Sequence, residues 1–285
     1  MAKKLTVLPK PIGPFQIGRT HLNFIDEDRI DPTPLAGGKN RDIPIIIWYP
    51  TDDPGSIPPL KLLKPRDLDI LKEFFIYEII PNKICDIVTN SHEDAPISNK
   101  TSNFPLLIFN YGLSSFIEQN TILMEHLASY GYIVVSIGHP FDGVASYPDG
   151  RSIPMDAEFI KGFVEQTTKE DKVFMDNIKQ LQREEITIED MKKFTENYLL
   201  TNNVMNDKVE IWVDDVIFIT NVLEKMNKGL IKSQFERKIT FEKGVGVFGH
   251  SYGGVTAILS CCLDDRLKCG INMDGAMYGG LKKKI

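Results

Sequence analysis

The chain has 285 residues, of which 42% are hydrophobic and 25% are charged, and its formal net charge at neutral pH is −6. These proportions are typical of a globular protein, and they exclude a disordered chain, a collagen-like chain and a coiled-coil rod. The acidic balance argues against nucleic acid as the main partner, because binding phosphates requires a basic surface. The length suits one domain over residues 1–285.

Cysteine usage and the N-terminus bear on the cellular compartment. Four cysteines in 285 residues, two of them the adjacent Cys261 and Cys262, do not make a disulfide scaffold, so a reducing compartment fits. No CxxC pair occurs, and we expect no cofactor. After the basic first residues, only residues 5–8 precede Pro9, which is too short for the apolar region of a signal peptide. Residues 244–263 carry no charge but contain five glycines, which favours buried structure over a membrane span. We therefore expect a cytoplasmic protein.

The first third of the chain predicts short strands and one helix. Strand-like segments at 15–25 and 43–48 lie in a region rich in proline and glycine, which indicates a meander of edge strands. A helix is predicted over 67–88, interrupted at Pro81. Its broad apolar face consists of Leu68, Leu71, Phe74, Phe75 and Ile79. This face, between Leu68 and Ile80, either packs in the core or touches a membrane surface transiently.

From residue 104 onwards, predicted strands alternate with predicted helices. The strands are expected at 104–109, 132–137, 244–248 and 269–273, and the helices at 118–130, 207–226 and 252–263. Gly131 is expected to follow the first of these helices at its C-terminus. Alternation of this kind predicts an α/β fold, with a mainly parallel sheet and helices on both faces.

Residues 155–205 interrupt this alternation with a polar, helical insertion. The sequence at 187–190 fits a capping box at the start of a helix. Ligands of open α/β sheets bind beyond the carboxyl ends of the strands, so the simplest interpretation is a helical cap over that edge. A helical excursion away from the site is the alternative.

The motif with the clearest chemical meaning is GxSxG at residues 249–253. It follows a predicted buried strand and opens a predicted helix, which is the arrangement of a nucleophile elbow. A sharp strand-to-helix turn brings the backbone close to positions two before and two after the serine, where glycine avoids a Cβ clash. The turn would expose the Ser251 hydroxyl and direct the Tyr252 N–H at a developing oxyanion.

A serine nucleophile also needs a second oxyanion donor and an acid. The loop after the predicted strand at 104–109 contains Gly112, so the Leu113 N–H is the candidate for the second donor. Asp274 ends the strand at 269–273, on the sheet edge that carries Ser251, where an acid can orient an imidazole. The alternative for Asp274 is a loop aspartate that bonds its own backbone.

No histidine follows Ser251, although a triad of this fold runs serine, acid, histidine along the chain. The five histidines are His21, His92, His126, His139 and His250. His250 adjoins the serine but is expected to point away from it. His139 follows a strand at its carboxyl end, so it is a candidate to line the pocket and the next choice of base.

Taken in order, several short motifs make the chain resemble the platelet-activating factor acetylhydrolase family of α/β-hydrolases. They extend from Pro11 to Gly280 and lie at 13–18, 47–50, 104–109, 111–113, 131–132, 249–254 and 269–274. The resemblance implies Ser251 as nucleophile and Asp274 as acid. It implies the backbone N–H groups of Leu113 and Tyr252 as the oxyanion hole. It also implies hydrolysis of short or oxidised acyl chains on phospholipids, without a metal.

Two departures from the family pattern stand out. Many relatives have histidine where Tyr111 stands, and Tyr111 is therefore a second candidate to line the pocket. The family's catalytic histidine lies well beyond the acid, whereas this chain ends at Ile285. The chain thus resembles a truncated member that lacks the last strands and helix. We expect the strand at 269–273 to form an uncovered sheet edge that favours self-association.

Two functional hypotheses follow from these residues. The first is a serine ester hydrolase that acts on a small-molecule or lipid ester through an acyl-enzyme. The second is a non-catalytic protein of the same fold that binds a lipid or a partner, motivated by the absence of a histidine after Ser251.

Overall fold

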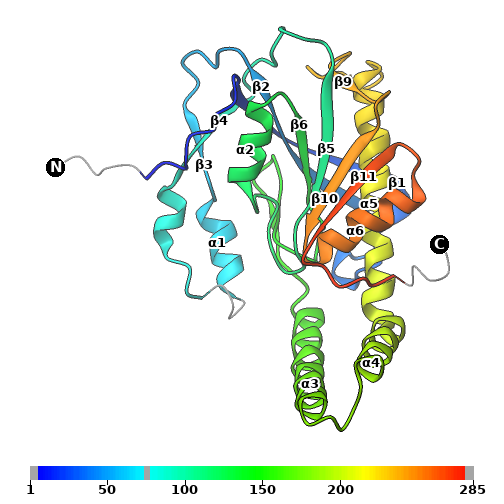
Figure 1. Ribbon diagram of the computed structural model, residues 1–285. Coiled ribbons are helices and arrows are strands. Elements are labelled where there is room, and N and C mark those ends of the chain that lie inside the picture. The colour runs from blue at the N-terminus through cyan, green and yellow to red at the C-terminus, as the bar shows by residue number, and fades with distance from the viewer. Residues whose placement is uncertain (1–5, 74–77, 280–285) are drawn as a thin grey trace.

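Figure 1 shows the computed structural model of the chain, which describes residues 6–73 and 78–279. The strands of its main sheet are β1 (Gln16–Ile30), β2 (Asn40–Thr51), β3 (Pro59–Lys61), β4 (Val88–Glu93), β5 (Phe104–Asn110), β6 (Ile133–Ile137), β9 (Ile239–Thr240), β10 (Val245–His250) and β11 (Leu267–Met273). Their order is β11-β10-β5-β6-β2-β1-β4-β3, with β9 paired to β5 outside this path. Two further strands, β7 (Ala145–Ser146) and β8 (Ser152–Ile153), form a separate antiparallel pair.

Helices cover both faces of the sheet. They are α1 (Pro65–Lys72), α2 (Thr121–Ser129), α3 (Ala157–Gln182), α4 (Ile188–Thr201), α5 (Asn203–Asn227) and α6 (Tyr252–Leu263). Short 3₁₀ turns lie at Pro34–Ala36 and Asn82–Asp86. Helix α5 packs against α6 on one face, and α2 lies on the other (Figure 1).

Strand β2 shows why the central strands are apolar on both sides. Side chains alternate across a strand, so Ile45 and Ile47 join the core that contains Leu223 of α5, whereas Ile46 joins the core that contains Met124 of α2. All three isoleucines are fully buried. Burying each such side chain contributes about 1.5–3 kcal/mol. These contacts fix the sheet between its two helical layers.

The strands of the α/β half confirm the predicted fold class. Strands β5, β6, β10 and β11 pair in parallel, as the alternation of strands and helices predicts. Gly131 follows α2 with a φ of +97°, the left-handed conformation expected after that helix. Strand β11 is an edge strand of the described sheet, and its Ile271 side chain is 54% exposed.

Two predictions for the N-terminal third are wrong. Strand β2 is not an edge strand, because it pairs with both β1 and β6. The helix predicted over 67–88 is too long: α1 ends at Lys72, and Val88 begins β4, which pairs between β1 and β3. Pairing across the sheet has overridden the local pattern. Phe74 and Phe75 lie outside the described residues.

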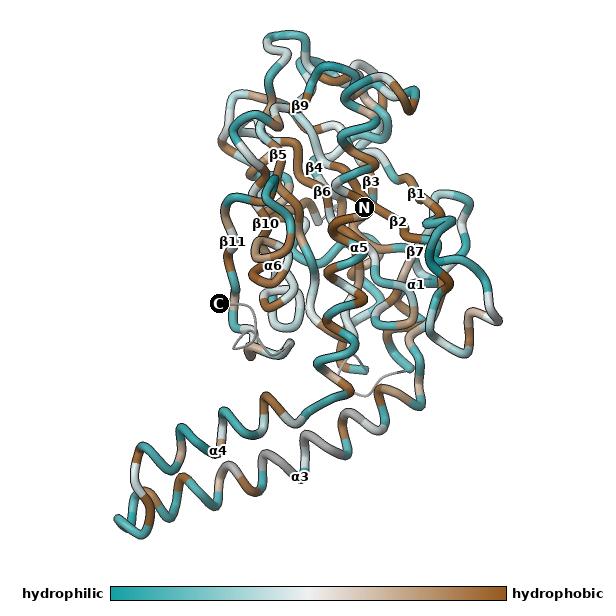
Figure 2. The backbone as a smooth tube through the Cα atoms, turned by 90° about the vertical axis from the view of Figure 1, so that its right-hand side faces the viewer, coloured by the Kyte–Doolittle hydropathy of each residue, from teal (hydrophilic) through white to brown (hydrophobic). Residues whose placement is uncertain are grey.

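The insertion at 155–205 forms a helical hairpin that extends away from the sheet (Figure 2). The predicted capping box is present at the start of α4, where Thr187 and Asp190 bond reciprocally. At the base of the hairpin, Tyr198 of α4 lies 3.1 Å from Tyr278 between hydroxyl oxygens. A cap role for the hairpin stays a prediction. Within the described ranges, no helix combines the length and apolar composition needed to cross a bilayer.

Candidate active site

Ser251 occupies a strained turn between β10 and α6. Its φ is +51° and its ψ is −120°, a conformation that side-chain-bearing residues rarely adopt. The turn is held by a hydrogen bond of 2.7 Å from the Ser251 N–H to the Met273 carbonyl at the end of β11. Ser251 is partly exposed at the carboxyl edge of the sheet.

The flanking glycines allow the turn to pack closely. A Cβ on Gly249 would lie 2.0 Å from the Gly253 carbonyl oxygen. A Cβ on Gly253 would lie 2.1 Å from the Asn110 carbonyl oxygen. Both obstacles are backbone atoms, which cannot rotate out of the way as a side chain can. The geometry therefore requires glycine at both motif positions, as the sequence predicts.

The loop after β5 lies directly against Ser251. A Cβ placed on Gly112 would be 3.3 Å from the Ser251 Cβ. The loop is anchored from outside, because Ser114, at a φ of +64°, donates its N–H to the Asp142 carbonyl at 2.8 Å. The structure thus brings the Gly112 backbone to Ser251, which directly precedes the first turn of α6, where helix N–H groups have no partner within the helix.

Asp274 lies at the end of β11, next to the strand that carries Ser251. Its φ is +64°, and its side chain is exposed. The following residue packs against the elbow, since a Cβ on Gly275 would lie 2.2 Å from the Ser251 carbonyl oxygen. Asn272 fixes this turn by accepting the Gly275 N–H at 2.7 Å. The sheet therefore brings Ser251, the Gly112 loop and Asp274 to one edge.

His139 is bound in a buried polar cluster. Its side chain is fully buried, and its ring stacks on Trp212 with centroids 3.7 Å apart. Its Nδ1 lies 2.8 Å from Asp215 Oδ2. The same carboxylate accepts two hydrogen bonds of 2.8 Å from the Arg41 guanidinium. Burial alone would raise the pKa of Asp215, but the charge of Arg41 lowers it well below its usual range.

The protonation of His139 follows from these partners. Burial lowers the pKa of His139, and this effect exceeds the opposing influence of Asp215, which favours the neutral ring. A neutral ring that donates Nδ1–H to Asp215 leaves Nε2 as an acceptor. Nε2 lies 3.1 Å from Asn110 Oδ1, which is also an acceptor, and the Asn110 amide nitrogen has no hydrogen-bond partner among the described residues. If the Asn110 amide is rotated so that its nitrogen and oxygen exchange places, the nitrogen donates to His139 Nε2 and both groups have a partner.

The other histidines are also placed by the structure. His21 Nε2 lies 2.9 Å from the Ser146 carbonyl, and His92 Nδ1 lies 2.6 Å from the Ile57 carbonyl. His126 packs its ring against Tyr130. His250 faces the Gly112 loop, and its Nδ1 is buried without a hydrogen-bond partner among the described residues. Proximity to Ser251 in the sequence therefore does not make His250 part of a hydrogen-bonded triad.

Tyr111 and His139 form hydrogen bonds with each other in the core next to the site. Both are fully buried, and their role in lining a substrate pocket stays a prediction. The Tyr111 hydroxyl donates to the His139 carbonyl at 3.1 Å and accepts the His139 N–H at 2.7 Å. Paired groups of this kind are typical of a core polar network. Tyr252 is also buried, and its hydroxyl donates to the Met205 carbonyl at the start of α5.

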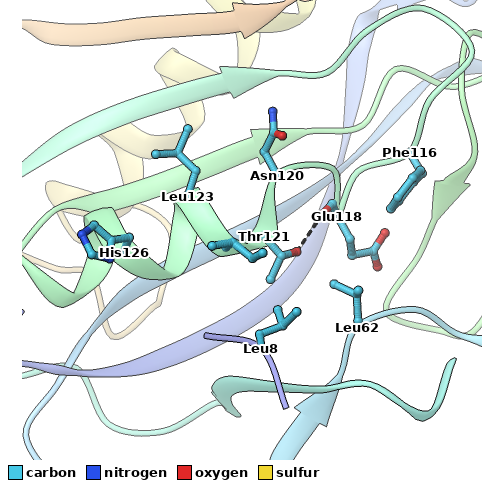
Figure 3. A pocket seen from close by; sticks show the side chains of 9 residues that line it. Leu8, Leu62, Phe116, Glu118, Asn120, Thr121, Leu123 and His126 are labelled. Carbon is cyan, nitrogen blue, oxygen red and sulfur yellow. Dashed lines mark hydrogen bonds between the residues drawn. The ribbon is translucent and has the colours of Figure 1, made fainter. Parts of the chain in front are cut away.

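A cavity of about 480 Å³ lies beside the segment that leads into α2 (Figure 3). In this view Leu8, Leu62, Phe116 and Glu118 surround a common space. Burial raises the pKa of Glu118 although Arg19 lies 3.3 Å away and lowers it. The nine described residues that line the cavity do not include Ser251, so the cavity is separate from the elbow.

Comparison with known proteins identifies relatives of the chain. Over residues 1–283 it matches the family model described as platelet-activating factor acetylhydrolase, isoform II. The platelet-activating factor acetylhydrolase of Cavia porcellus is 21% identical over 278 residues, which cover 96% of this chain and 56% of that protein. The probable 1-alkyl-2-acetylglycerophosphocholine esterase of Arthroderma benhamiae is 23% identical over 288 residues, which cover 96% of this chain and 60% of that protein. The chain thus spans little more than half the length of these relatives.

A solved structure shares the fold. The ferulic acid esterase from Streptomyces cinnamoneus superimposes with a TM-score of 0.68 at 21% sequence identity, covering 96% of this chain and 63% of that chain. At this identity the likeness supports the fold alone. The chain has an α/β-hydrolase fold and belongs to the family of platelet-activating factor acetylhydrolase, isoform II.

Proposed function

We propose that the chain carries the nucleophile and oxyanion hole of a serine carboxylic-ester hydrolase. The observation that carries this proposal is the strained backbone of Ser251, at a φ of +51°, with the Gly112 loop packed against it. Strain of this kind persists where it serves a mechanism, because it costs about 1–3 kcal/mol. The names of the relatives favour a phospholipid ester with a short acyl chain as substrate.

The proposed reaction is acyl transfer to Ser251 followed by hydrolysis. The Ser251 oxygen forms a bond to the ester carbonyl carbon as its proton passes to a general base, and the carbonyl oxygen becomes an oxyanion that the N–H groups of Leu113 and Tyr252 bind. The bond to the leaving oxygen then breaks, and this oxygen takes up the proton, which releases the alcohol and leaves an acyl-serine. Water attacks the acyl group and gives a proton to the base, the bond to the Ser251 oxygen breaks, and the carboxylic acid and the free serine hydroxyl are released. Asp274 is the proposed acid that orients the base.

The general base separates the two functional hypotheses. The lowered pKa of His139 favours the neutral ring, but the ring is enclosed between Asp215 and Asn110, so it is a poor acceptor for the Ser251 proton. This observation favours the second candidate, a non-catalytic protein of the same fold that binds a lipid or a partner. An activated ester distinguishes the two, because a good leaving group needs no protonation and acylation then depends mainly on the nucleophile and the oxyanion hole.

The test is the hydrolysis of p-nitrophenyl acetate by the chain beside its Ser251→Ala variant. We expect a burst of p-nitrophenolate close to one per chain, followed by slow turnover, and no burst in the variant. Equal progress curves for the two proteins would refute the esterase and favour the binding protein. Sustained turnover that depends on Ser251 would support the esterase and contradict our assignment of His139.

We propose two contacts for the surface as well. A transient membrane contact would involve only the distal part of the segment from Leu68 to Ile80, because Leu68 and Leu71 are core residues whereas Ile79 is 89% exposed. Self-association would use the edge of β11, where Ile271 is exposed. Vesicle co-sedimentation of Ile79→Glu tests the first contact, and sedimentation velocity of Ile271→Lys tests the second.

A further inference from the structure

Gln119 connects the start of α2 to the loop beside Ser251. It lies two residues before α2, in the turn closed by its own N–H to the Phe116 carbonyl at 3.0 Å. Its side-chain Oε1 accepts the Gly112 N–H at 3.0 Å. Gly112 is the residue whose Cα faces Ser251. One side chain thus reaches from the base of α2 to the backbone that adjoins the elbow.

This hydrogen bond fixes one of the two peptide groups that flank the Gly112 Cα. The other is fixed by its carbonyl, which accepts the Ser115 N–H at 3.0 Å. The C=O and N–H of a trans peptide point in opposite directions, so the Leu113 N–H points away from Ser115. The Gly112 N–H is already engaged by Gln119, which leaves the Leu113 N–H as the donor that this loop can offer an oxyanion.

We propose that Gln119 is a positioning residue for the oxyanion hole. Without its carbonyl oxygen, the Tyr111–Gly112 peptide can rotate, because glycine at 112 has wide conformational freedom. Rotation of this peptide shifts the Gly112 Cα, and the Leu113 N–H shifts with it, because the Gly112–Leu113 peptide is then held, among the described residues, only by the hydrogen bond from Ser115. Losing one oxyanion donor costs about 10²–10³ in rate, and misdirecting one costs less, so we expect a loss of about tenfold. This inference rests on the proposed esterase function.

The test compares Gln119→Leu, which removes the acceptor, with Gln119→Glu, which keeps it. The matched control is Gln180→Leu, because Gln180 is a half-buried glutamine of α3. The readout is the second-order rate constant for phosphonylation of Ser251 by a fluorophosphonate, measured between pH 5 and pH 8 and divided by the wild-type value at each pH. We expect Gln119→Leu to be about tenfold slower at every pH and Gln180→Leu to be unchanged.

Gln119→Glu separates positioning from a structural role. Its carboxylate accepts the Gly112 N–H, but its negative charge disfavours the oxyanion, so its relative rate should rise as the pH falls and the carboxyl becomes neutral. A relative rate that stays as low as that of Gln119→Leu at every pH would overturn the proposal. An unchanged rate in Gln119→Leu would overturn it as well.

A second measurement keeps the proposal independent of activity. Amide hydrogen exchange at Gly112 should become faster in Gln119→Leu and stay slow in Gln180→Leu, whether or not Ser251 reacts. A wild-type chain that is not labelled at Ser251 would refute the proposed function. Unchanged exchange at Gly112 would refute the role of Gln119.

Discussion

Two polar clusters lie close together beneath the same sheet edge and differ in how their groups are satisfied. In the buried cluster of Arg41, His139 and Asp215, the charged groups and ring nitrogens have partners at 2.6–3.1 Å. In the elbow cluster of Gly112, Ser251 and Asp274, the last two residues have φ angles of +51° and +64°, Ser251 is partly exposed and Asp274 is exposed. Satisfied groups stabilise a fold, whereas reactive groups must remain available.

The buried cluster contains a histidine with an acid partner, yet we expect it to be less reactive than the elbow at Ser251. His139 has an acid and a stacked aromatic ring, as a catalytic histidine often has, yet each of its nitrogens is engaged. Asn110 joins the two clusters, because its side chain meets His139 while its carbonyl lies against Gly253. We therefore infer that the buried cluster stabilises the position of the elbow through Asn110.

The largest effect on stability should come from breaking the buried cluster with Asp215→Ala. Removing this carboxylate leaves the buried Arg41 guanidinium without its main partner, which should cost about 3–5 kcal/mol of unfolding free energy. Urea denaturation measures the change. Asp214→Ala is the control, because Asp214 is the exposed neighbour on the same helix. Similar losses of unfolding free energy in Asp215→Ala and Asp214→Ala would show that the buried cluster does not stabilise the fold as we infer.

The elbow should respond to Gly253→Ala. The added Cβ would lie 2.1 Å from the Asn110 carbonyl oxygen, so the loop and helix must separate. We expect a stability loss of about 1–3 kcal/mol and a large fall in Ser251 labelling. Gly162→Ala in α3 meets nothing within 4 Å and should raise stability by about 0.5–1 kcal/mol. If Ser251 is labelled as fast in Gly253→Ala as in the wild type, the close packing of Gly253 against the Asn110 carbonyl is not needed for reactivity, which would contradict our account.

Acidification should weaken the fold through its buried histidines. Burial lowers the pKa of His139, and burial together with Arg19 lowers the pKa of His21 to about 3. Between pH 7.5 and pH 5 the unfolded chain takes up a proton at His21 that the folded chain does not, so stability should fall by about 1–2 kcal/mol, and the lowered pKa of His139 acts in the same direction. Urea midpoints measure this slope, and His21→Gln should reduce it. An unchanged slope in His21→Gln would refute this account.

The smallest effect should come from the helical hairpin, which belongs to neither cluster. Thr187→Ala removes the capping box of α4 and should cost about 1 kcal/mol of local helix stability. Amide exchange along α4 measures the loss, and Ser251 labelling should stay unchanged. A change in labelling would show that the hairpin is coupled to the elbow, as the contact between Tyr198 and Tyr278 at its base would permit.

The elbow could be predicted from the sequence because its determinants are local. The glycines that flank Ser251, the apolar strand before it and the helix after it lie within a short stretch, and Gly112 follows a strand of the same type. Strand pairing then brings these pieces together at one edge, since parallel strands end at the same side of a sheet.

The buried cluster could not be predicted in the same way. Arg41 and Asp215 are 174 residues apart, and no local pattern relates them. Gln119 gave no signal either, because its role depends on a single hydrogen bond to a backbone group. The length of α1 was misjudged because β4 is stabilised by partners on both sides rather than by its own composition. The cytoplasmic location and the roles of the individual site residues stay predictions.

The most direct test of the elbow as a reactive site is mass spectrometry of the chain after treatment with a fluorophosphonate. The account predicts one adduct per chain on the peptide that contains Ser251, and none in the Ser251→Ala variant. The absence of an adduct on folded wild-type protein, or an adduct at another serine, would contradict it.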